Sequence, residues 1–495
     1  MPRPPLSPSA RISVLALCGG LALTAGAAAT TGTEPHNLLV VVLDDVGVDK
    51  IASYSGSDAP NAPSTPTLAG LARDGVSFRN AWSNPTCSPT RAAALTGQRA
   101  ERTGIGEGLP PGPGLDPDVR TIADLLGEAG YATAAIGKWH IGAKRNHALQ
   151  VGFDHHSGTR ANVGPGGYFH WQKFVDGVDA GRQRGYATSA TADDAVAWIN
   201  RQAGPWFAWV AFHAPHRPLH APPAALHTRG SLDSATSPAA ALYAAMLEAA
   251  DRELARVIEA AAPNATVIVF GDNGTYADAI EPPFDPEHAK KSAYQGGVHV
   301  PLFVAGKAVA ADNRGSSSSA LIHVSDLFAT LAELAGSTET AEDSISFVPQ
   351  LRDAHTPGRA TVYTSGFQPN GGPPIPERYV RAARNERFKL IRTGGIGSGE
   401  NRHELYDLIE DPHERHDLAA ARERDRAAHL ALEALSRVID AHEWSGPVEP
   451  AAARGTLLRF IASLIAVALA LTGAMVLRRR QSRRHARPAD PTASD

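Results

Sequence analysis

Cysteine is almost absent from this chain, which carries only Cys18 and Cys87 in 495 residues. Cys18 lies in an apolar N-terminal run that we expect to be removed, so Cys87 would remain as the single cysteine of an exported protein. One cysteine excludes an internal disulfide, and a lone thiol in an oxidising compartment is a liability unless it is buried or used in chemistry. Cys87 is therefore a candidate for a chemical role.

A strong charge of either sign is also lacking. The formal net charge is −4, which gives no reason to expect nucleic acid as a partner. Hydrophobic residues make up 43% and charged residues 20% of the chain, the range of an ordinary globular protein with a sizeable core. The sequence has no internal repeat, and its length fits one large domain with a smaller one.

Residues 1–29 have the features of a secretory signal peptide. Arg3 and Arg11 precede an apolar run from Ile12 to Ala29, which ends in small residues. A positive start, a short apolar stretch and small residues before the mature chain are typical of such signals. A buried N-terminal helix is the structural alternative. Lipidation of the cysteine within the run is a weaker one, because a bulky leucine precedes it.

A second apolar segment lies near the C-terminus. The 18 residues from Phe460 to Leu477 carry no charge, and about 20 apolar residues suffice to cross a bilayer. An arginine-rich tail follows, and cationic flanks stay on the cytoplasmic side. We therefore expect a linker over 446–456, an anchor in the cell membrane over 457–477, a cytoplasmic tail over 478–495 and an extracytoplasmic body. An amphipathic or core helix is the alternative for the apolar segment.

Short apolar runs alternate with helical patterns along the body of the chain. Asn37 to Leu43 is a continuous run rich in β-branched residues, as expected for a strand covered on both faces. The alternation predicts an α/β fold with a large, mostly parallel, helix-covered sheet, whose carboxyl edge collects the polar residues that follow the strands. Further strands are expected at Tyr131–Ile136, Trp206–Phe212 and Thr266–Phe270, and helices at Thr121–Ala129, Asp193–Gln202 and Ala240–Ala260.

After about Ser365 the pattern changes to a Gly-Gly-Pro-Pro loop followed by two alternating stretches, Tyr379–Arg384 and Arg387–Arg392, and a helical stretch, Asp425–Glu443. We therefore predict a catalytic α/β domain over 35–365 and a smaller C-terminal α+β domain over 366–445.

Two other segments also lead to predictions. Ser316–Ser319 is expected to form a surface loop. The stretch Gly164–Asp179 contains four consecutive aromatic residues, counting the histidine, and is expected either to line the substrate site or to pack as a surface loop.

The residues from Cys87 to Arg91 read Cys-Ser-Pro-Thr-Arg and continue as Ala-Ala-Ala-Leu-Thr-Gly, a loop entering a helix. The reactive atom would then lie near the helix N-terminus, where the helix dipole and free N–H groups favour an anion. Taken alone, a cysteine with an arginine one turn later is equally compatible with a buried structural cysteine.

This motif, together with several others, closely resembles the type I sulfatases of the alkaline phosphatase-like superfamily. Their Cys-x-Pro-x-Arg motif is matched in full, and the resemblance spans roughly residues 37–418. It implies the fold of that superfamily and an arylsulfatase-like activity on sulfate esters. The other matching segments are Asp44-Asp45, Gly137-Lys138-Trp139-His140, His213-Ala214-Pro215-His216, Gly271-Asp272-Asn273-Gly274, Tyr294 to Pro301, Glu404 to Leu408, Asp411-Pro412 and Glu414.

The resemblance implies a nucleophile made from Cys87. A separate formylglycine-generating enzyme would oxidise this cysteine, and the hydrated aldehyde would attack sulfur, giving a sulfated formylglycine at residue 87. Arg91 would brace the formylglycine and share its charge. His140 would take a proton from the second hydroxyl and so expel sulfate, and His216 would protonate the leaving alcohol.

The resemblance also implies two lysines that bind the sulfate group. Lys138 would neutralise sulfate oxygens, and Lys290 matches the second sulfate-binding lysine of the family. Lys291 is adjacent to Lys290, so a shift of one residue would exchange them. His213 is expected to be structural or to line the substrate site.

Asp44, Asp45, Asp272 and Asn273 offer hard oxygen ligands from two strand ends. This set suits Ca²⁺ or Mg²⁺ and not zinc, because no set of histidine or cysteine ligands accompanies it. Each pair alone is more often a turn. The resemblance implies that these four residues and formylglycine-87 bind one Ca²⁺, with Mg²⁺ as the alternative ion. The metal would lower the pKa of the attacking hydroxyl and polarise a sulfate oxygen.

Two positions depart from the family pattern. Gln295 stands where the family usually has glutamate, and His299 where it has arginine. We expect these changes to affect local packing more than chemistry.

Two rival functions remain open at this stage. A phosphonate monoester or phosphodiester hydrolase of the same superfamily uses a similar motif, and sulfate and phosphate esters differ by one charge. An inactive, membrane-tethered relative that only binds anionic ligands is the second rival, although the intact set of candidate residues disfavours it. A zinc-dependent phosphatase is weaker still, because the zinc ligands are missing.

Overall fold

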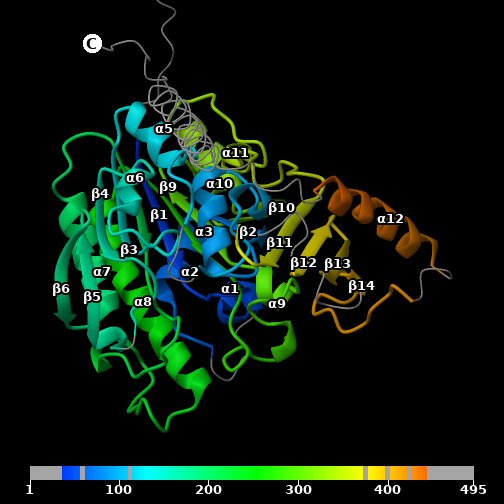
Figure 1. The fold of residues 1–495 in the computed structure, drawn as a ribbon, viewed down its shortest axis with the longest axis horizontal. Coiled ribbons are helices and arrows are strands. Elements are labelled where there is room, and N and C mark those ends of the chain that lie inside the picture. The colour runs from blue at the N-terminus through cyan, green and yellow to red at the C-terminus, as the bar shows by residue number, and fades with distance from the viewer. Residues whose placement is uncertain are drawn as a thin grey trace, which may run out of the picture. The chain divides into compact units, whose positions relative to one another are not determined.

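The computed structural model describes residues 36–55, 62–109, 114–164, 166–371, 377–395, 402–420 and 425–442 (Figure 1). All of them belong to one compact unit of the chain. The predicted signal peptide, linker, membrane anchor and basic tail lie outside the described residues. Among the residues that are described, no helix is long and apolar enough to cross a membrane.

A ten-stranded mixed sheet forms the larger part of the fold. Its central strands run parallel, and the antiparallel pairs lie on either side of them. The order of strands is β10 (Ser316–His323), β2 (Gly75–Trp82), β9 (Leu302–Gly306), β8 (Ala265–Gly271), β1 (Asn37–Leu43), β7 (Trp206–Ala211), β3 (Ala132–Lys138), β4 (His155–Thr159), β5 (His170–Val175) and β6 (Val178–Arg184).

Helices cover both faces of this sheet, because its central strands are apolar on both sides. Leu38, Val40 and Val42 of β1 pack into one core cluster, and the residues between them pack into another. Burial on both faces explains the continuous apolar runs of the sequence. One cluster includes residues of α3 (Cys87–Thr96), α5 (Ile122–Glu128), α10 (Asp326–Leu334) and α11 (Val348–Arg352), and the other includes residues of α2 (Pro66–Asp74), α7 (Ala187–Ile199) and α8 (Ala239–Ala261).

A second, four-stranded antiparallel sheet forms a smaller domain, which carries one helix (Figure 1). Leu435 and Ile439 of that helix share a core cluster with Leu390 and Leu405 of the sheet. The elements are β11 (Val362–Gln368), β12 (Arg378–Arg384), β13 (Phe388–Gly394), β14 (Arg402–Asp407) and α12 (Arg426–Ala441). Short helices elsewhere are α1 (Ala52–Ser55), α4 (Ala100–Thr103), α6 (His147–Gln150) and α9 (Gln295–Val298).

The predicted fold class is confirmed, and most predicted elements lie within two residues of the observed ones. β1 has the predicted bounds, and α5 begins after the capping residue Thr121, whose side chain accepts a hydrogen bond from the backbone N–H of Asp124. The helix predicted from Asp193 is α7, which begins six residues earlier, at Ala187. Its first turns are rich in alanine, serine and threonine and carry little apolar periodicity, so the pattern did not reveal them.

Two segments predicted as loops contain strands. Ser316–Ser319, predicted as a surface loop, is the start of β10, which pairs in parallel with β2 at the edge of the sheet. An edge strand can keep polar side chains on its solvent side, and serine therefore misled the prediction. The stretch Gly164–Asp179 includes β5, and its Tyr168 and Trp171 are buried in the core.

Candidate active site

The carboxyl ends of four neighbouring parallel strands, β8, β1, β7 and β3, meet at one edge of the large sheet. Asp44 follows β1 directly, Asp272 follows β8 directly, and Lys138 is the last residue of β3. Parallel strands bring such residues together although they are far apart in the sequence. Ligand atoms of Asp44, Asp272 and Cys87, the first residue of α3, all lie within 4.8 Å of one another.

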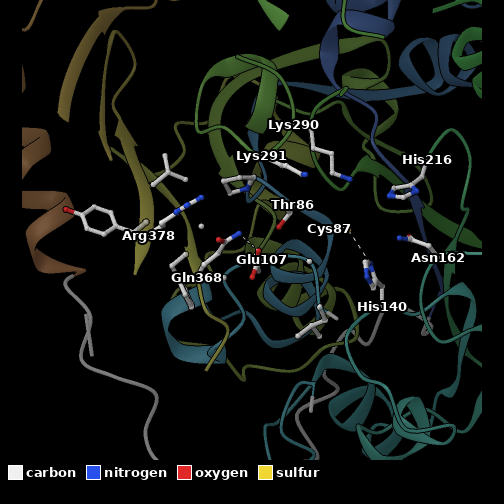
Figure 2. A pocket seen from close by; sticks show the side chains of 18 residues that line it. Thr86, Cys87, Glu107, His140, Asn162, His216, Lys290, Lys291, Gln368 and Arg378 are labelled. Atoms are coloured by element: carbon white, nitrogen blue, oxygen red, sulfur yellow. Dashed lines mark hydrogen bonds between the residues drawn. The ribbon is translucent and has the colours of Figure 1, made fainter. Parts of the chain in front are cut away.

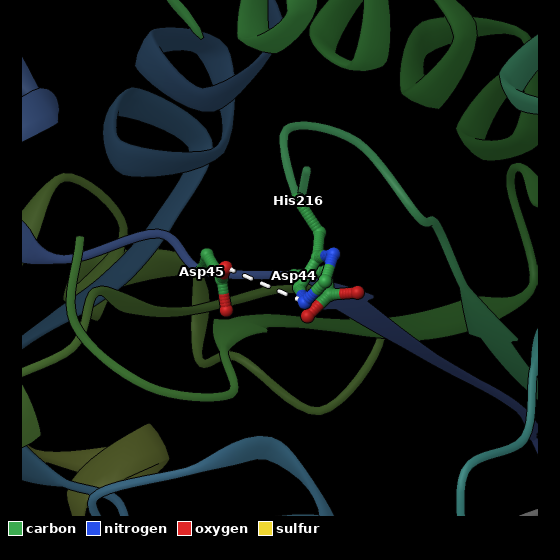
Figure 3. Close-up of side chains that lie close together, drawn as sticks. All are labelled: Asp44, Asp45 and His216. Atoms are coloured by element: carbon green, nitrogen blue, oxygen red, sulfur yellow. Dashed lines mark ion pairs between the residues drawn. The ribbon is translucent and has the colours of Figure 1, made fainter. Parts of the chain in front are cut away.

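A cluster of buried oxygen-bearing side chains forms the floor of this site. The backbone N–H of Asp45 donates to Asp272 Oδ1 (3.0 Å), and the amide of Asn273 donates to Asp45 Oδ1 (2.8 Å). Asp44 and Asp272 are fully buried. Figure 3 shows Asp44 and Asp45 beside His216, whose Nε2 lies 3.8 Å from Asp45 Oδ2.

The cluster fits a divalent cation. Asp44 Oδ1 and Asn273 Oδ1 are buried and have no hydrogen-bond partner among the described residues. Buried polar atoms are rarely left without a partner, so two orphaned oxygens in one cluster point to a cation that would satisfy them. Carboxylate and amide oxygens are the ligands that Ca²⁺ and Mg²⁺ prefer.

Three buried cations offset the carboxylates. Arg91 donates Nε and Nη2 to Asp272 Oδ2 (2.9 and 2.8 Å) and Nη1 to the carbonyl of Lys138 (2.8 Å). Lys138 Nζ pairs with Asp44 Oδ2, and Lys290 Nζ pairs with Asp45 Oδ1. Burial alone would raise the pKa of Asp45, but the charges of Lys290 and the other nearby cations hold it well below its usual range.

Cys87 lies at the N-terminus of α3 and is almost fully buried. Its Sγ is 3.2 Å from His140 Nδ1. Burial raises the pKa of the Cys87 thiol, and the nearby ammonium groups of Lys138 and Lys290 offset this only in part. The unmodified thiol is therefore protonated at neutral pH, which makes it a poor nucleophile.

His140 is placed by two local features. It adopts a left-handed backbone conformation (φ 61°), two residues after the end of β3, and its carbonyl accepts a hydrogen bond from Ser88 Oγ (2.7 Å). Such a conformation costs a non-glycine residue about 1–3 kcal/mol and occurs most often at functional sites. Burial, followed by the charge of Lys138, lowers the pKa of His140 well below its ordinary value.

The two histidines of the His-Ala-Pro-His segment have different surroundings. His213 is buried, and its Nε2 lies 2.7 Å from Thr159 Oγ1, inside the protein. The His216 side chain is 17% exposed, and burial lowers its pKa to about 3. Tyr168 donates to the carbonyls of both histidines (2.6 and 2.7 Å) and so holds the turn between them.

The structure separates the adjacent lysines. Lys290 reaches Asp45, whereas Lys291 has a left-handed backbone (φ 79°), is exposed and has no ion-pair partner in the part of the chain that is described. Both line a cavity of about 560 Å³ that opens above Cys87 (Figure 2). The site therefore brings together the predicted catalytic and metal-binding residues, with Lys290 and not Lys291 at the carboxylates.

Sequence reasoning missed several residues of the site. Tyr243 of α8 donates to the carbonyl of Asp45 (2.6 Å), and Asn162 and Glu107 line the cavity. Tyr168 was singled out only as an aromatic residue. A tyrosine on the otherwise alanine-rich face of a buried helix was the one available signal for Tyr243, because a buried tyrosine hydroxyl usually has a hydrogen-bond partner.

Gln295 and His299 contact each other. Gln295 Nε2 lies 3.4 Å from His299 Nδ1, its Oε1 accepts from Trp82 Nε1 (3.0 Å), and His299 Nε2 lies 2.8 Å from the carbonyl of Arg79. Both side chains are engaged in packing between β2 and α9, away from the carboxylates.

Comparison with known proteins gives a consistent result. A sequence model of the family "Sulfatase" matches residues 36–337. Arylsulfatase J of Mus musculus is 29% identical over 340 residues, which are 62% of this chain and 54% of the mouse protein. N-acetylgalactosamine-6-sulfatase of Homo sapiens is 28% identical over 388 residues, 69% of this chain and 70% of the human protein. The chain thus spans about half the length of the mouse relative.

The solved structures extend this similarity to the fold. The crystal structure of Ps i-CgsB in complex with k-i-k-neocarrahexaose superposes with a TM-score of 0.68 at 24% identity, covering 87% of this chain and 98% of that one. At this level of identity the similarity shows a common fold.

Proposed function

Because the chain belongs to the sulfatase family of hydrolases, we propose that it hydrolyses a sulfate ester with a formylglycine nucleophile made from Cys87 and with the help of one Ca²⁺. The observation that carries this proposal is the convergence of Asp44, Asp272 and Cys87 within 4.8 Å, beside His140 and three buried cations. Neither a structural cysteine nor an acidic turn needs this combination.

The metal would be held by Asp44, Asp45, Asp272 and Asn273 together with residue 87. Support comes from the two orphaned oxygens and from the predominance of oxygen ligands. The candidate metal groups among the described residues contain one histidine, His216, and one cysteine, Cys87, whereas zinc sites usually have several such ligands. When bound, a divalent cation lowers the pKa of a coordinated hydroxyl and polarises a sulfate oxygen. Mg²⁺ is the alternative ion.

The modification at residue 87 would be installed by a formylglycine-generating enzyme, which is therefore a proposed partner during maturation. The hydrated aldehyde supplies one hydroxyl for attack on sulfur and a second whose deprotonation lets the sulfate leave. The protonated, buried thiol of Cys87 explains why the unmodified residue would not serve.

The surrounding side chains would move the protons and hold the anion. His140, 3.2 Å from Cys87 Sγ, is in reach to take a proton from a group on residue 87. His216 lines the cavity on the side of Asp45. Burial keeps its imidazole neutral, so it would deliver a proton to the alcohol only once the bound anionic ester raises its pKa. Lys138 and Lys290 would bind the sulfate oxygens, and Arg91 would brace residue 87. The sum of the reaction is one ester and one water giving an alcohol and sulfate.

We also propose that the protein acts outside the cytoplasm. The apolar segment after Arg11 supports export, and the uncharged run Phe460 to Leu477 with its arginine-rich flank supports an anchor in the cell membrane.

Mass spectrometry of the peptide that contains residue 87 tests the proposal. In protein from its native host, we expect a loss of about 18 Da relative to unmodified cysteine, as thiol is replaced by aldehyde. Hydrolysis of an aryl sulfate should exceed that of an aryl phosphonate and a phosphodiester, and Cys87→Ala should abolish it. Unmodified cysteine in the active protein would overturn the mechanism, and faster phosphonate hydrolysis would overturn the choice of substrate.

A further inference from the structure

Two cavities meet beside Cys87. The larger one, of about 560 Å³, extends toward β11 and β12 of the small domain, and we call it the small-domain arm. The other, of about 240 Å³, extends toward the β5–β6 hairpin, and we call it the hairpin arm. Leu109, His140 and Asn162 line both cavities. Cys87 itself lines only the small-domain arm, but its neighbour His140, 3.2 Å away, lines both arms, so the reacting group lies close to their junction.

The outer part of the small-domain arm carries two exposed cations. Lys291 and Arg378 line it, and neither has an ion-pair partner among the described residues. The one carboxylate of the lining, Glu107, accepts a hydrogen bond from the amide of Gln368. Figure 2 shows Lys291 and Arg378 on one side of Cys87, and Asn162 and His216 on the other.

The hairpin arm is also cationic. Arg160 and Arg182 line it, both are exposed, and no carboxylate occurs among its described lining residues. Arg160 is held in place, because Nη1 donates to the carbonyl of Ala143 (2.7 Å) and its guanidinium lies 4.8 Å from the centre of the Phe174 ring. Its other N–H groups remain available to an anion.

A simple sulfate monoester does not need these residues. The inner cations Lys138 and Lys290, which here pair with Asp44 and Asp45, are the ones that the proposed function assigns to its single charged group. The outer cations lie in both arms, and each arm adds a side-chain amide and an aromatic ring, Gln368 and Tyr379 in one and Gln172 and Phe174 in the other. Amides and aromatic rings suit hydroxyl-bearing rings, and arginine and lysine suit anionic substituents on them.

We propose that the substrate is a linear, multiply anionic oligosaccharide, and that the scissile sulfate belongs to an internal unit. This proposal rests on the proposed function. Lys291 and Arg378 bind an anionic group of the unit on one side, and Arg160 and Arg182 bind one on the other side. The enzyme thus removes sulfate from within a chain and does not require a chain end.

Comparison of three substrates tests this proposal. They are a linear hexasaccharide with one sulfate on each unit, the disaccharide of the same polymer, and 4-nitrophenyl sulfate. We expect the wild-type kcat/KM to be highest for the hexasaccharide, and mass spectrometry to locate the first sulfate lost on an internal unit. The double variants Lys291→Gln/Arg378→Gln and Arg160→Gln/Arg182→Gln should each lower kcat/KM for the hexasaccharide about tenfold. Both should leave 4-nitrophenyl sulfate unchanged.

Arg201→Gln is the matched control, because Arg201 is exposed and lines neither cavity. It should leave all three rates unchanged. Equal losses on 4-nitrophenyl sulfate, no loss on the hexasaccharide, or first release of sulfate from a chain end would each overturn the two-armed site. Failure of the wild type to hydrolyse any of the three would instead overturn the proposed function.

Discussion

Binding of an anion at this site should be strengthened by the divalent cation. Without metal the buried charges are balanced, since three carboxylates face three cationic side chains. They are Asp44, Asp45 and Asp272, and Arg91, Lys138 and Lys290. A divalent cation adds two positive charges to a buried site, and an anion in contact with it would offset them. Metal and sulfate should therefore favour each other's binding.

The size of this coupling follows from the distances. The ligand atoms of Asp44, Cys87 and Asp272 lie within 4.8 Å of one another, so a cation among them and an anion at residue 87 would be near neighbours. Unit charges ~4 Å apart interact by about 4 kcal/mol at an effective dielectric constant of 20. Desolvation of both ions opposes this, and couplings between ligands are typically about 1–3 kcal/mol, or 5–150-fold in affinity. We expect the upper part of that range.

Isothermal titration calorimetry of inorganic sulfate into Cys87→Ala protein measures the coupling without turnover. The titration is done once with saturating Ca²⁺ and once after chelation. Sulfate should bind at least tenfold more tightly with Ca²⁺, and Ca²⁺ should bind more tightly by the same factor with sulfate present, because linkage is reciprocal.

Circular dichroism of the chelated protein serves as the control, because unfolding would also abolish sulfate binding. Lys138→Met should weaken sulfate binding in the presence of Ca²⁺. Equal sulfate affinity in folded protein with and without Ca²⁺ would refute the charge-balance argument.

Three further predictions concern the folded state. Arg91→Gln should lower the free energy of unfolding in urea by about 3–5 kcal/mol, because it leaves Asp272 buried without its ion-pair partner; a loss below about 1 kcal/mol would contradict this. Burial lowers the pKa of His156 to about 4, so this residue binds more protons in the unfolded chain between pH 6.5 and 4. Its own contribution to the free energy of unfolding should therefore fall by about 3 kcal/mol as the pH drops through that window. His156→Leu should flatten the urea-measured stability profile there; an unchanged slope would exclude His156 as its source. Gly137→Ala should lower the free energy of unfolding in the same assay by about 1–3 kcal/mol and should also lower kcat. The reason is that a Cβ at this position (φ +95°) would lie 2.1 Å from the carbonyl of Ala211. A variant with unchanged stability and kcat would show that β3 adjusts freely.

Much of the fold was predictable because the central strands are buried on both faces. β1 and β8 are continuous apolar runs, so their positions follow from composition to within one residue at each end. Edge elements were less predictable. The first residues of β10 are serines, whose strand conformation depends on pairing with β2, a contact between segments more than 200 residues apart. No local pattern contains that information.

The candidate site was predictable to the extent that its residues follow strands or belong to short motifs. Asp44 and Asp272 each stand directly after a buried strand, which brings them to one edge. Tyr243 and Asn162 gave no comparable signal, since they reach the site from a long helix and an irregular loop. The choice between Lys290 and Lys291 depends on the left-handed backbone at Lys291, which turns one side chain toward Asp45 and the other toward the small-domain arm.

The two departures from the family pattern make sense as a pair. Gln295 and His299 are in contact, and burial lowers the pKa of His299 to about 3, so both side chains are neutral. The backbone N–H of Gln295 donates to the buried carboxylate of Glu414, which comes from the small domain. A glutamate at 295 would place a buried carboxylate against the neutral His299, with Trp82 Nε1 as its hydrogen-bond donor. Two neutral side chains avoid the free-energy cost of burying that carboxylate. The small domain can therefore hold the start of α9, which lies five residues after Lys290. The charge of the site itself does not change.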